Sequence, residues 1–409
     1  MMAQRLHSQT SQLHRSNKPE KPVMLCLSHL RWDFVFQRPQ HLITRACSTY
    51  RVLFFEEPFF DSDIPTITLN DHGHGPIIAQ PHLPADTDSR QRNLMLRGLL
   101  DEALASLNVT QPNLIWYYSP AMITFTGHLK ADCIVYDCMD ELAAFRGAPI
   151  DLKWRERELF ARADLVFTGG QSLFEAKRRM HPAVHAFPSS IDKQHFQRAR
   201  QLRNPRSDSQ RPHIGFFGVI DERMDTALVA AMADLRPNWE FSMIGPVAKI
   251  DITDLPQRDN LNWLGGRHYS SLPGVLAEWS LGIMPFAINE ATRYISPTKT
   301  PEFLAAGLPV VSTPIRDVVR PYGEMRLVAI AATADEFVAQ CEKCLAWTAT
   351  EHAAWLARTD QFLARISWDQ TWSAMNELVK QLVAQRRCVS AAPTKPSTLS
   401  FRSPGVVRV

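Results

Sequence analysis

The stretch from Leu281 to Thr313 limits the possible folds most strongly, because its pattern indicates a strand, a polar loop, a short helix and a second strand in succession. Two apolar runs, 281–286 and 309–312, have the length and composition of buried strands. Between them, Gly307 stands where a glycine commonly ends a helix. Two buried strands joined through a helix predict a parallel sheet, in which ligands bind at the carboxyl ends of the strands.

The loop and the helix start of this stretch carry residues suited to a diphosphate and a ribose. Pro301 lacks an amide hydrogen and is tolerated best at the first helical position, which predicts Thr300 as the N-cap. The backbone N–H groups of the first turn and the Lys299 side chain favour phosphate, and the Glu302 carboxylate can accept both hydroxyls of a ribose. The same spacing is equally consistent with a capped helix that carries a surface Lys–Glu pair, worth about 0.2–0.5 kcal/mol.

This stretch resembles the donor-binding segment of GT-B glycosyltransferases, in particular the retaining family four and its teichuronic-acid-type subset. The resemblance rests on Glu302 at the start of a helix that ends in Ala-Ala-Gly, followed by a Pro-Val-Val strand. It implies that Glu302 holds the ribose of a nucleotide sugar. The family carries a second Glu, separated from this one by seven residues, which orients the sugar. Here Tyr294 takes that position, so its role would pass to Asn289 or Glu290.

The resemblance implies further donor contacts in the second half of the chain. These are Gly218 at a strand end, Gly266 and Arg267 beside the base, and the backbone near Ser296, Thr298 and Thr300. The family holds the diphosphate with an Arg and a Lys at positions that are Val219 and Met224 here. Arg223 is the remaining cation in that loop, and a surface arginine is the alternative. The field of Arg223 and Lys299 would stabilise the leaving phosphate.

In the first half, the resemblance points to Asp140, Arg38 and His41. Asp140 follows a buried strand, and Met139 stands where the family has a His that faces the sugar. Capping of a helix is the alternative role for Asp140. The loop after the first strand lacks the family's Gly-Gly turn, which makes Arg38 and His41 candidates for binding the donor phosphates or the acceptor. Helix capping by Arg38 and Gln40 is the alternative.

Strands and helices alternate in both halves, which predicts an α/β protein with two Rossmann-like domains facing an interdomain cleft, as in the GT-B fold. The first half lacks a G-x-G-x-x-G fingerprint, so a dinucleotide is not expected there. The expected parts are a flexible tail over 1–22, an N-terminal acceptor domain over 23–197, a polar linker over 198–212, a C-terminal nucleotide-sugar domain over 213–367, a helix over 368–386 that crosses back, and a disordered tail over 387–409.

Composition narrows the classes of function. The 409 residues suffice for two domains, and a formal charge of +3 is too mild to indicate a nucleic-acid partner. No run approaches the roughly 18 apolar residues of a membrane span. Seven scattered cysteines indicate a reduced, cytoplasmic protein. The mild basic charge is compatible with peripheral association at the inner face of a membrane. No metal-binding pattern is visible, so we expect neither a metal nor a cofactor beyond the donor substrate.

These observations predict a hexosyltransferase that moves a sugar from a nucleoside-diphosphate sugar to a glycan, lipid or other acceptor. Retention of the anomeric configuration is implied by the resemblance. One alternative is a sugar-nucleotide epimerase on the same scaffold. The other, from a different class, is a catalytically silent protein that binds sugar nucleotides.

Overall fold

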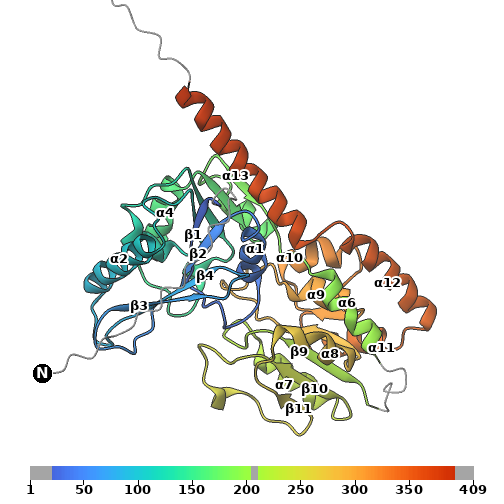
Figure 1. Cartoon of the computed structure of the whole chain (residues 1–409). Helices are drawn as coiled ribbons and strands as arrows, with labels where there is room; N and C mark the ends of the chain where they lie inside the picture. The colour runs from blue at the N-terminus through green and yellow to red at the C-terminus, as the bar shows by residue number, and fades with distance from the viewer. Residues whose placement is uncertain (1–20, 204–210, 392–409) are drawn as a thin grey trace, which may run out of the picture.

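The computed structural model describes residues 21–203 and 211–391, which fold around two β-sheets (Figure 1). Most of the expected N-terminal tail and the end of the expected C-terminal tail lie outside the described residues. In the described part of the chain, no helix is both long and apolar enough to cross a membrane.

The N-terminal sheet has the strand order β3-β4-β2-β1-β5-β6-β7-β8. Neighbouring strands are parallel except β3 and β4, which form an antiparallel hairpin; β4 also pairs with β2, so the hairpin extends the sheet. The strands are β1 (Val23–Leu27), β2 (Arg51–Phe55), β3 (Thr66–Asp71), β4 (Ile77–His82), β5 (Leu114–Tyr117), β6 (Cys133–Cys138), β7 (Leu165–Thr168) and β8 (Val184–Ala186).

Alternate residues of these strands feed two apolar cores, as the period of a strand requires. On β1, Leu25 and Leu27 face one core, while Met24 and Cys26 face the other. The first core is closed by α2 (Ser89–Ser106), α3 (Ile123–Thr126), α4 (Leu152–Arg162) and α5 (Gln171–Lys177). The second is closed by α1 (Arg38–Ala46) and by α13 (Trp368–Ala391).

The C-terminal sheet has the order β11-β10-β9-β12-β13-β14, which is the strand order of a dinucleotide-binding Rossmann fold. All its pairs are parallel. The strands are β9 (His213–Phe217), β10 (Glu240–Ile244), β11 (Leu261–Trp263), β12 (Leu281–Met284), β13 (Val310–Ser312) and β14 (Ala329–Ile330). The helices are α7 (Thr226–Leu235), α8 (Leu272–Ala277), α9 (Lys299–Ala305), α10 (Arg316–Val318), α11 (Ala334–Leu345) and α12 (Ala349–Leu363).

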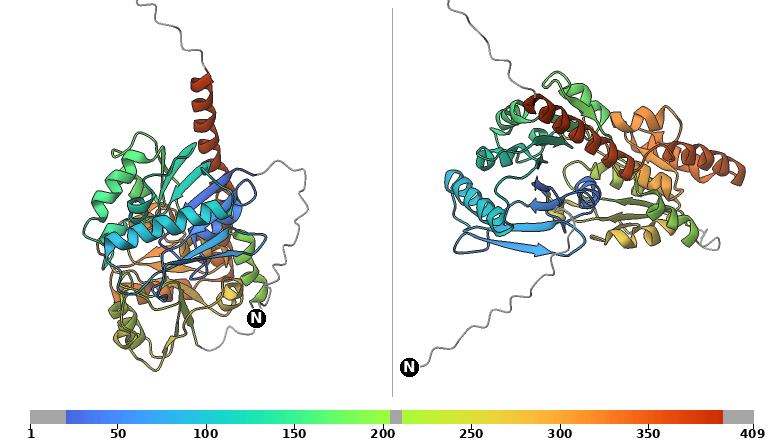
Figure 2. Two further views of the ribbon diagram at one scale, coloured as in Figure 1. Left: turned by 60° about the vertical axis from the view of Figure 1, so that its left-hand side comes forward. Right: turned by 45° about the horizontal axis from the view of Figure 1, so that its top comes forward.

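Two helices join the halves, α6 (Lys193–Leu202) and α13. Figure 2 shows α13 running from the C-terminal half along the N-terminal half, where Trp368 and Trp372 are buried. The ends of both helices differ from expectation. Residues 198–202 of the expected linker continue α6, and residues 387–391 of the expected tail continue α13.

Candidate active site

A cleft with two compartments lies between the two sheets. The larger cavity, of about 400 Å³, is lined by the loop after β1 and by residues after β9, β10 and β11. The smaller cavity, of about 110 Å³, is lined by Arg38 and Asp140 from the N-terminal half and by Arg223 and the segment 295–299 from the C-terminal half. Both cavities are lined by Gln37, Gly218, Val219 and Lys299, so they form one continuous site.

Two glycines allow the strand ends to approach each other at this site. Gly218 has φ +146°, and a Cβ there would lie 3.1 Å from Cε of Lys299. Gly245 has φ +155°, and a Cβ there would lie 1.7 Å from the carbonyl oxygen of Gly218. L-amino acids with side chains rarely adopt such angles. The sequence-predicted Gly218 therefore gives the Lys299 side chain its room in the cleft.

The helix of the opening stretch, α9, begins at Lys299, and the prediction of Thr300 as its N-cap is wrong. Thr298 takes the cap position. The Thr300 side chain is fully buried and donates to Sδ of Met284 at 3.4 Å, so it faces the core and not the cleft. The amide of Thr300 is also engaged, by the carbonyl of Pro297 at 3.3 Å. Gly307 follows the helix with φ +74°, the conformation expected of the glycine that ends it.

Glu302 is a buried residue that lines the larger cavity. The residue is 3% exposed, and its Oε2 has no hydrogen-bond partner among the described residues. Burial raises the pKa of Glu302 to about 7. The positive charge of Lys299 opposes this rise, and the negative charge of Asp192 adds to it. A buried oxygen that is left without a donor costs about 1–3 kcal/mol. Oε2 is therefore an open acceptor that a ligand in this cavity can use.

Lys299 lies where the two cavities meet. Its Nζ donates to Oγ1 of Thr298 at 3.0 Å and sits 5.6 Å from the centre of the Phe217 ring. Burial lowers the pKa of Lys299, and the charge of Glu302 opposes that effect. Among the described residues no carboxylate oxygen lies within 4 Å of Nζ, so two of its hydrogens are available to an anion.

The smaller cavity brings Asp140 and Arg223 together across the cleft. Burial raises the pKa of Asp140 to about 6, and Arg223 opposes this rise. Asp140 does not cap a helix: the next helical turn begins at Leu142, with Glu141 in the cap position. Arg223 is not a free surface residue, because its guanidinium grips Asp221 through contacts of 2.7 and 3.0 Å. The positive charge of Arg223 is therefore partly neutralised by Asp221 before a ligand binds.

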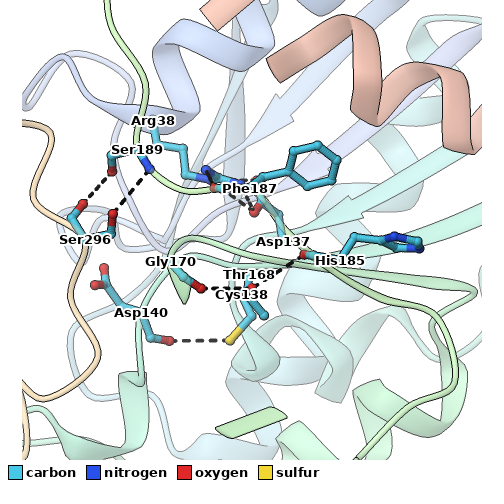
Figure 3. Close-up of polar contacts among 10 residues, drawn as sticks. All are labelled: Arg38, Asp137, Cys138, Asp140, Thr168, Gly170, His185, Phe187, Ser189 and Ser296. Atoms are coloured by element: carbon cyan, nitrogen blue, oxygen red, sulfur yellow. Dashed lines mark hydrogen bonds and ion pairs between the residues drawn. The ribbon is translucent and has the colours of Figure 1, made fainter. Parts of the chain in front are cut away.

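Ser296 and Thr298 also line the smaller cavity. Ser296 contacts the N-terminal half directly, because Ser189 donates to its carbonyl oxygen (Figure 3). The predicted Arg267 lines the larger cavity, and Gly266 adjoins it beside Pro246. These placements gather most of the predicted donor residues around one cleft.

The structure corrects the expected roles of Arg38 and His41. Arg38 is 3% exposed, and its guanidinium donates to Asp137 at 2.8 Å and to the carbonyl oxygen of Phe187 at 2.7 Å (Figure 3). The fully buried Asp137 requires this counter-charge, so the guanidinium is not free for phosphate. His41 is 2% exposed and stacks on Trp368 at 4.7 Å; it lies behind Phe36 and lines neither cavity itself. The helix start is instead braced by the Gln37 amide, which donates to Oε1 of Gln40.

The expected substitutes for the missing family Glu are also corrected. Tyr294 packs against the core of the N-terminal half and lines neither cavity of the cleft. The Glu290 side chain is 75% exposed and pairs with Arg293. Asn289 is engaged locally, by accepting from the amide of Thr292. None of the three reaches the site.

One residue of the site was missed by the sequence analysis. Tyr269 lines the larger cavity together with Glu302, and its ring stacks on Phe36 of the N-terminal half at 4.3 Å. Its signal in the sequence was weak, since a tyrosine just before a helix is more often a packing residue. The loop from Trp32 to Phe36, which lacks the family's Gly-Gly turn, forms the N-terminal wall of the same cavity.

Two Rossmann-like halves that face a cleft, with a final helix returning to the first half, define the GT-B class of fold. Solved structures bear this out. Sucrose-phosphate synthase from Thermosynechococcus elongatus has a TM-score of 0.66 at 14% identity, covering 89% of this chain and all of that one. Anabaena HepE in complex with UDP and glucose has a TM-score of 0.62 at 15% identity, covering 87% of this chain and 99% of that one.

Sequence comparisons add the activity. Residues 211–346 match the family described as glycosyl transferases group 1. A Bacillus subtilis protein named as the teichuronic acid biosynthesis glycosyltransferase TuaH is 26% identical over 276 residues, covering 61% of this chain and 68% of its own. The chain is therefore a GT-B glycosyltransferase, which confirms the predicted fold class and the predicted type of enzyme.

Proposed function

We propose that this glycosyltransferase uses a nucleoside-diphosphate sugar and transfers the sugar, with retention of configuration, to a glycan or a lipid-linked acceptor. The observation that carries the proposal is the Glu302 carboxylate, buried with an open oxygen in a cavity that Lys299 also lines. Carboxylates accept hydrogen bonds from vicinal hydroxyls, and a neighbouring ammonium attracts phosphate. The name of TuaH supports a cell-envelope polysaccharide as the acceptor class.

In the proposed complex the nucleoside fills the larger cavity, with the base near Arg267 and the ribose on Glu302. The diphosphate lies at Gly218 and Lys299, where the two cavities meet. The donor sugar then enters the smaller cavity beside Asp140. At neutral pH most Asp140 side chains are ionised, because their pKa is about 6, and the carboxylate can orient sugar hydroxyls.

In the proposed reaction, the bond between the anomeric carbon and the phosphate oxygen breaks, and a bond to the acceptor oxygen forms on the same face of the sugar. The acceptor hydroxyl gives its proton to the departing phosphate. Lys299 would stabilise the negative charge that develops there, with Arg223 as a second cation. Contacts between the halves, such as that of Ser189 with Ser296, would help to exclude water from the cleft.

Nucleotide binding is expected to depend on the ionisation of Glu302. With a pKa of about 7, the ionised fraction of Glu302 rises about tenfold between pH 6 and pH 8. Only the carboxylate accepts both ribose hydroxyls, so the affinity for UDP or GDP should rise with pH. Glu302→Gln should bind about 10- to 100-fold more weakly at pH 8. It should also lose the part of the pH dependence that Glu302 supplies.

Isothermal titration calorimetry of both proteins across this range provides the measurement. The phosphates of the nucleotide titrate in both experiments, so their contribution cancels in the comparison. Parallel pH profiles for wild type and Glu302→Gln would remove Glu302 from the ribose contact. Failure of wild type to bind any nucleoside diphosphate would end the donor proposal.

Retention is tested by the product. Proton NMR of the first product formed from an α-linked nucleotide sugar should show an α-glycosidic bond, and a β-bond would refute retention. The same spectra separate the other candidates from transfer. A donor whose sugar is inverted at one carbon would indicate an epimerase, and an unchanged donor in the presence of acceptors would indicate a silent binding protein.

A further inference from the structure

Tyr269 is held between two rings that come from different parts of the chain. It opens the short turn Tyr269–Ser271 before α8. His195 of α6 stacks on it at 4.2 Å and 10°, and Phe36 of the loop after β1 stacks on it at 4.3 Å and 26°. Two rings this close cannot share one face, so they lie on opposite faces of Tyr269. The phenol ring is thus fixed, and it contacts the N-terminal half through the stacked ring of Phe36 and, at 5.6 Å, through the ring of His41.

The hydroxyl of Tyr269 is buried and unpaired. Its oxygen has no hydrogen-bond partner in the part of the chain that the structure describes, although the residue lines the larger cavity. Burial raises the pKa of Tyr269, and the charge of Glu302 raises it further, so the phenol keeps its proton. A proton donor on Tyr269 and an open acceptor on Glu302 therefore line the same cavity.

We propose that Tyr269 is a second nucleotide-positioning residue. Its hydroxyl donates a hydrogen bond to the same pentose diol from which Glu302 accepts one. This rests on the proposed nucleotide-sugar donor. A diol matches the pair because each hydroxyl both donates and accepts. One hydroxyl can donate to Oε2 of Glu302 while an oxygen of the diol accepts from Tyr269. Both unpaired atoms are then satisfied by one ligand group.

The same ring connects the nucleotide to the N-terminal half. A ligand that fixes Tyr269 also favours its stack with Phe36, and the linkage is reciprocal: the stack strengthens nucleotide binding by the same factor. Phe36 is 38% exposed, so its position depends largely on this contact and on the edge of His41, 4.7 Å away. Nucleotide affinity should therefore respond to Phe36.

Tyr269→Phe tests the hydroxyl, because it keeps the ring and both stacks. Calorimetry on the full chain would use UDP and GDP together with their 2′,3′-dideoxy forms. We expect the variant to bind the ribonucleotide about five- to tenfold more weakly than wild type and the dideoxy form with less than a twofold change. Equal losses for both forms would place the hydroxyl on the phosphates or the base and overturn the proposal.

Phe36→Leu tests the connection, with Phe60→Leu as the matched control. Phe60 is also a partly exposed phenylalanine of the N-terminal half, but it lies against Arg92, outside the cleft. Phe36→Leu should weaken ribonucleotide binding about two- to tenfold, and Phe60→Leu should leave it unchanged. Wild-type affinity in Phe36→Leu would refute the connection. Binding by wild type with no effect of Tyr269→Phe would refute the positioning role alone, whereas no binding by wild type would refute the donor proposal.

Discussion

Replacing Lys299 with Ala is expected to lower the turnover number about 100- to 1,000-fold, which is the usual cost of removing one preorganised donor from a site of developing charge. The ammonium lies where the two cavities meet, and the partner given to it by the described residues is the neutral hydroxyl of Thr298 at 3.0 Å. Its charge is therefore not cancelled by a nearby ion pair. A leaving phosphate at this position would therefore be stabilised by the whole positive charge of the ammonium.

Arg223 provides the internal comparison for this effect. Its guanidinium already makes a bidentate contact with Asp221, which is 5% exposed, so part of its charge is neutralised before any ligand arrives. Arg223→Ala should therefore reduce turnover less than Lys299→Ala does. The reverse order would assign the leaving phosphate to the smaller cavity and to Arg223.

The control for Lys299→Ala is Lys343→Ala, an exposed lysine on α11. Steady-state kinetics with saturating nucleotide sugar should show wild-type turnover for this control. Thermal melting should show that Lys299→Ala still folds, because no carboxylate oxygen in the described part of the chain lies within 4 Å of its Nζ. Turnover above one tenth of wild type in folded Lys299→Ala would contradict the role given to this lysine.

The fold could be predicted from the sequence because its signals are local. Apolar runs such as 281–286 marked the buried strands, and a glycine with positive φ marked the end of α9. The helix start was misplaced by two residues, at Thr300 in place of Thr298, since Pro301 is tolerated anywhere in the first turn and does not by itself identify the cap. Lys299 and Glu302, which line the cleft, could be predicted as candidates for the same local reason.

Residues whose neighbours are distant in sequence could not be placed in this way. Arg38 pairs with Asp137, 99 positions away, and His41 stacks on Trp368 from the returning helix. A helix start with an arginine and a histidine normally predicts exposure, yet both are buried here. Tyr269 acquired its role only through Phe36 and Glu302, which come from other elements.

Asp137→Ala is expected to destabilise the protein by about 3–5 kcal/mol, which is the range for breaking a buried ion pair. Asp137 and Arg38 are 0% and 3% exposed, and the substitution would leave the buried guanidinium without the carboxylate that pairs with it. Burial raises the pKa of Asp137, and the charge of Arg38 opposes this rise. Burying the ion pair therefore costs free energy, and removing one of its two partners costs more. Urea unfolding followed by circular dichroism measures the loss.

Two further variants decide whether the charge itself is the cause. Asp151→Ala removes an aspartate of the same half whose pair with Arg155 is exposed, and it should cost about 0.3–0.5 kcal/mol. Combining Asp137→Leu with Arg38→Met replaces both charges by apolar groups, and the double variant should be more stable than Asp137→Ala. If the double variant were the less stable one, the bond of Arg38 to the carbonyl oxygen of Phe187 would contribute more to stability than its bond to Asp137. That bond connects α1 to the segment that leads toward the second half. Arg38 would then act mainly as a brace between segments of the chain, and the carboxylate of Asp137 would serve only to neutralise it.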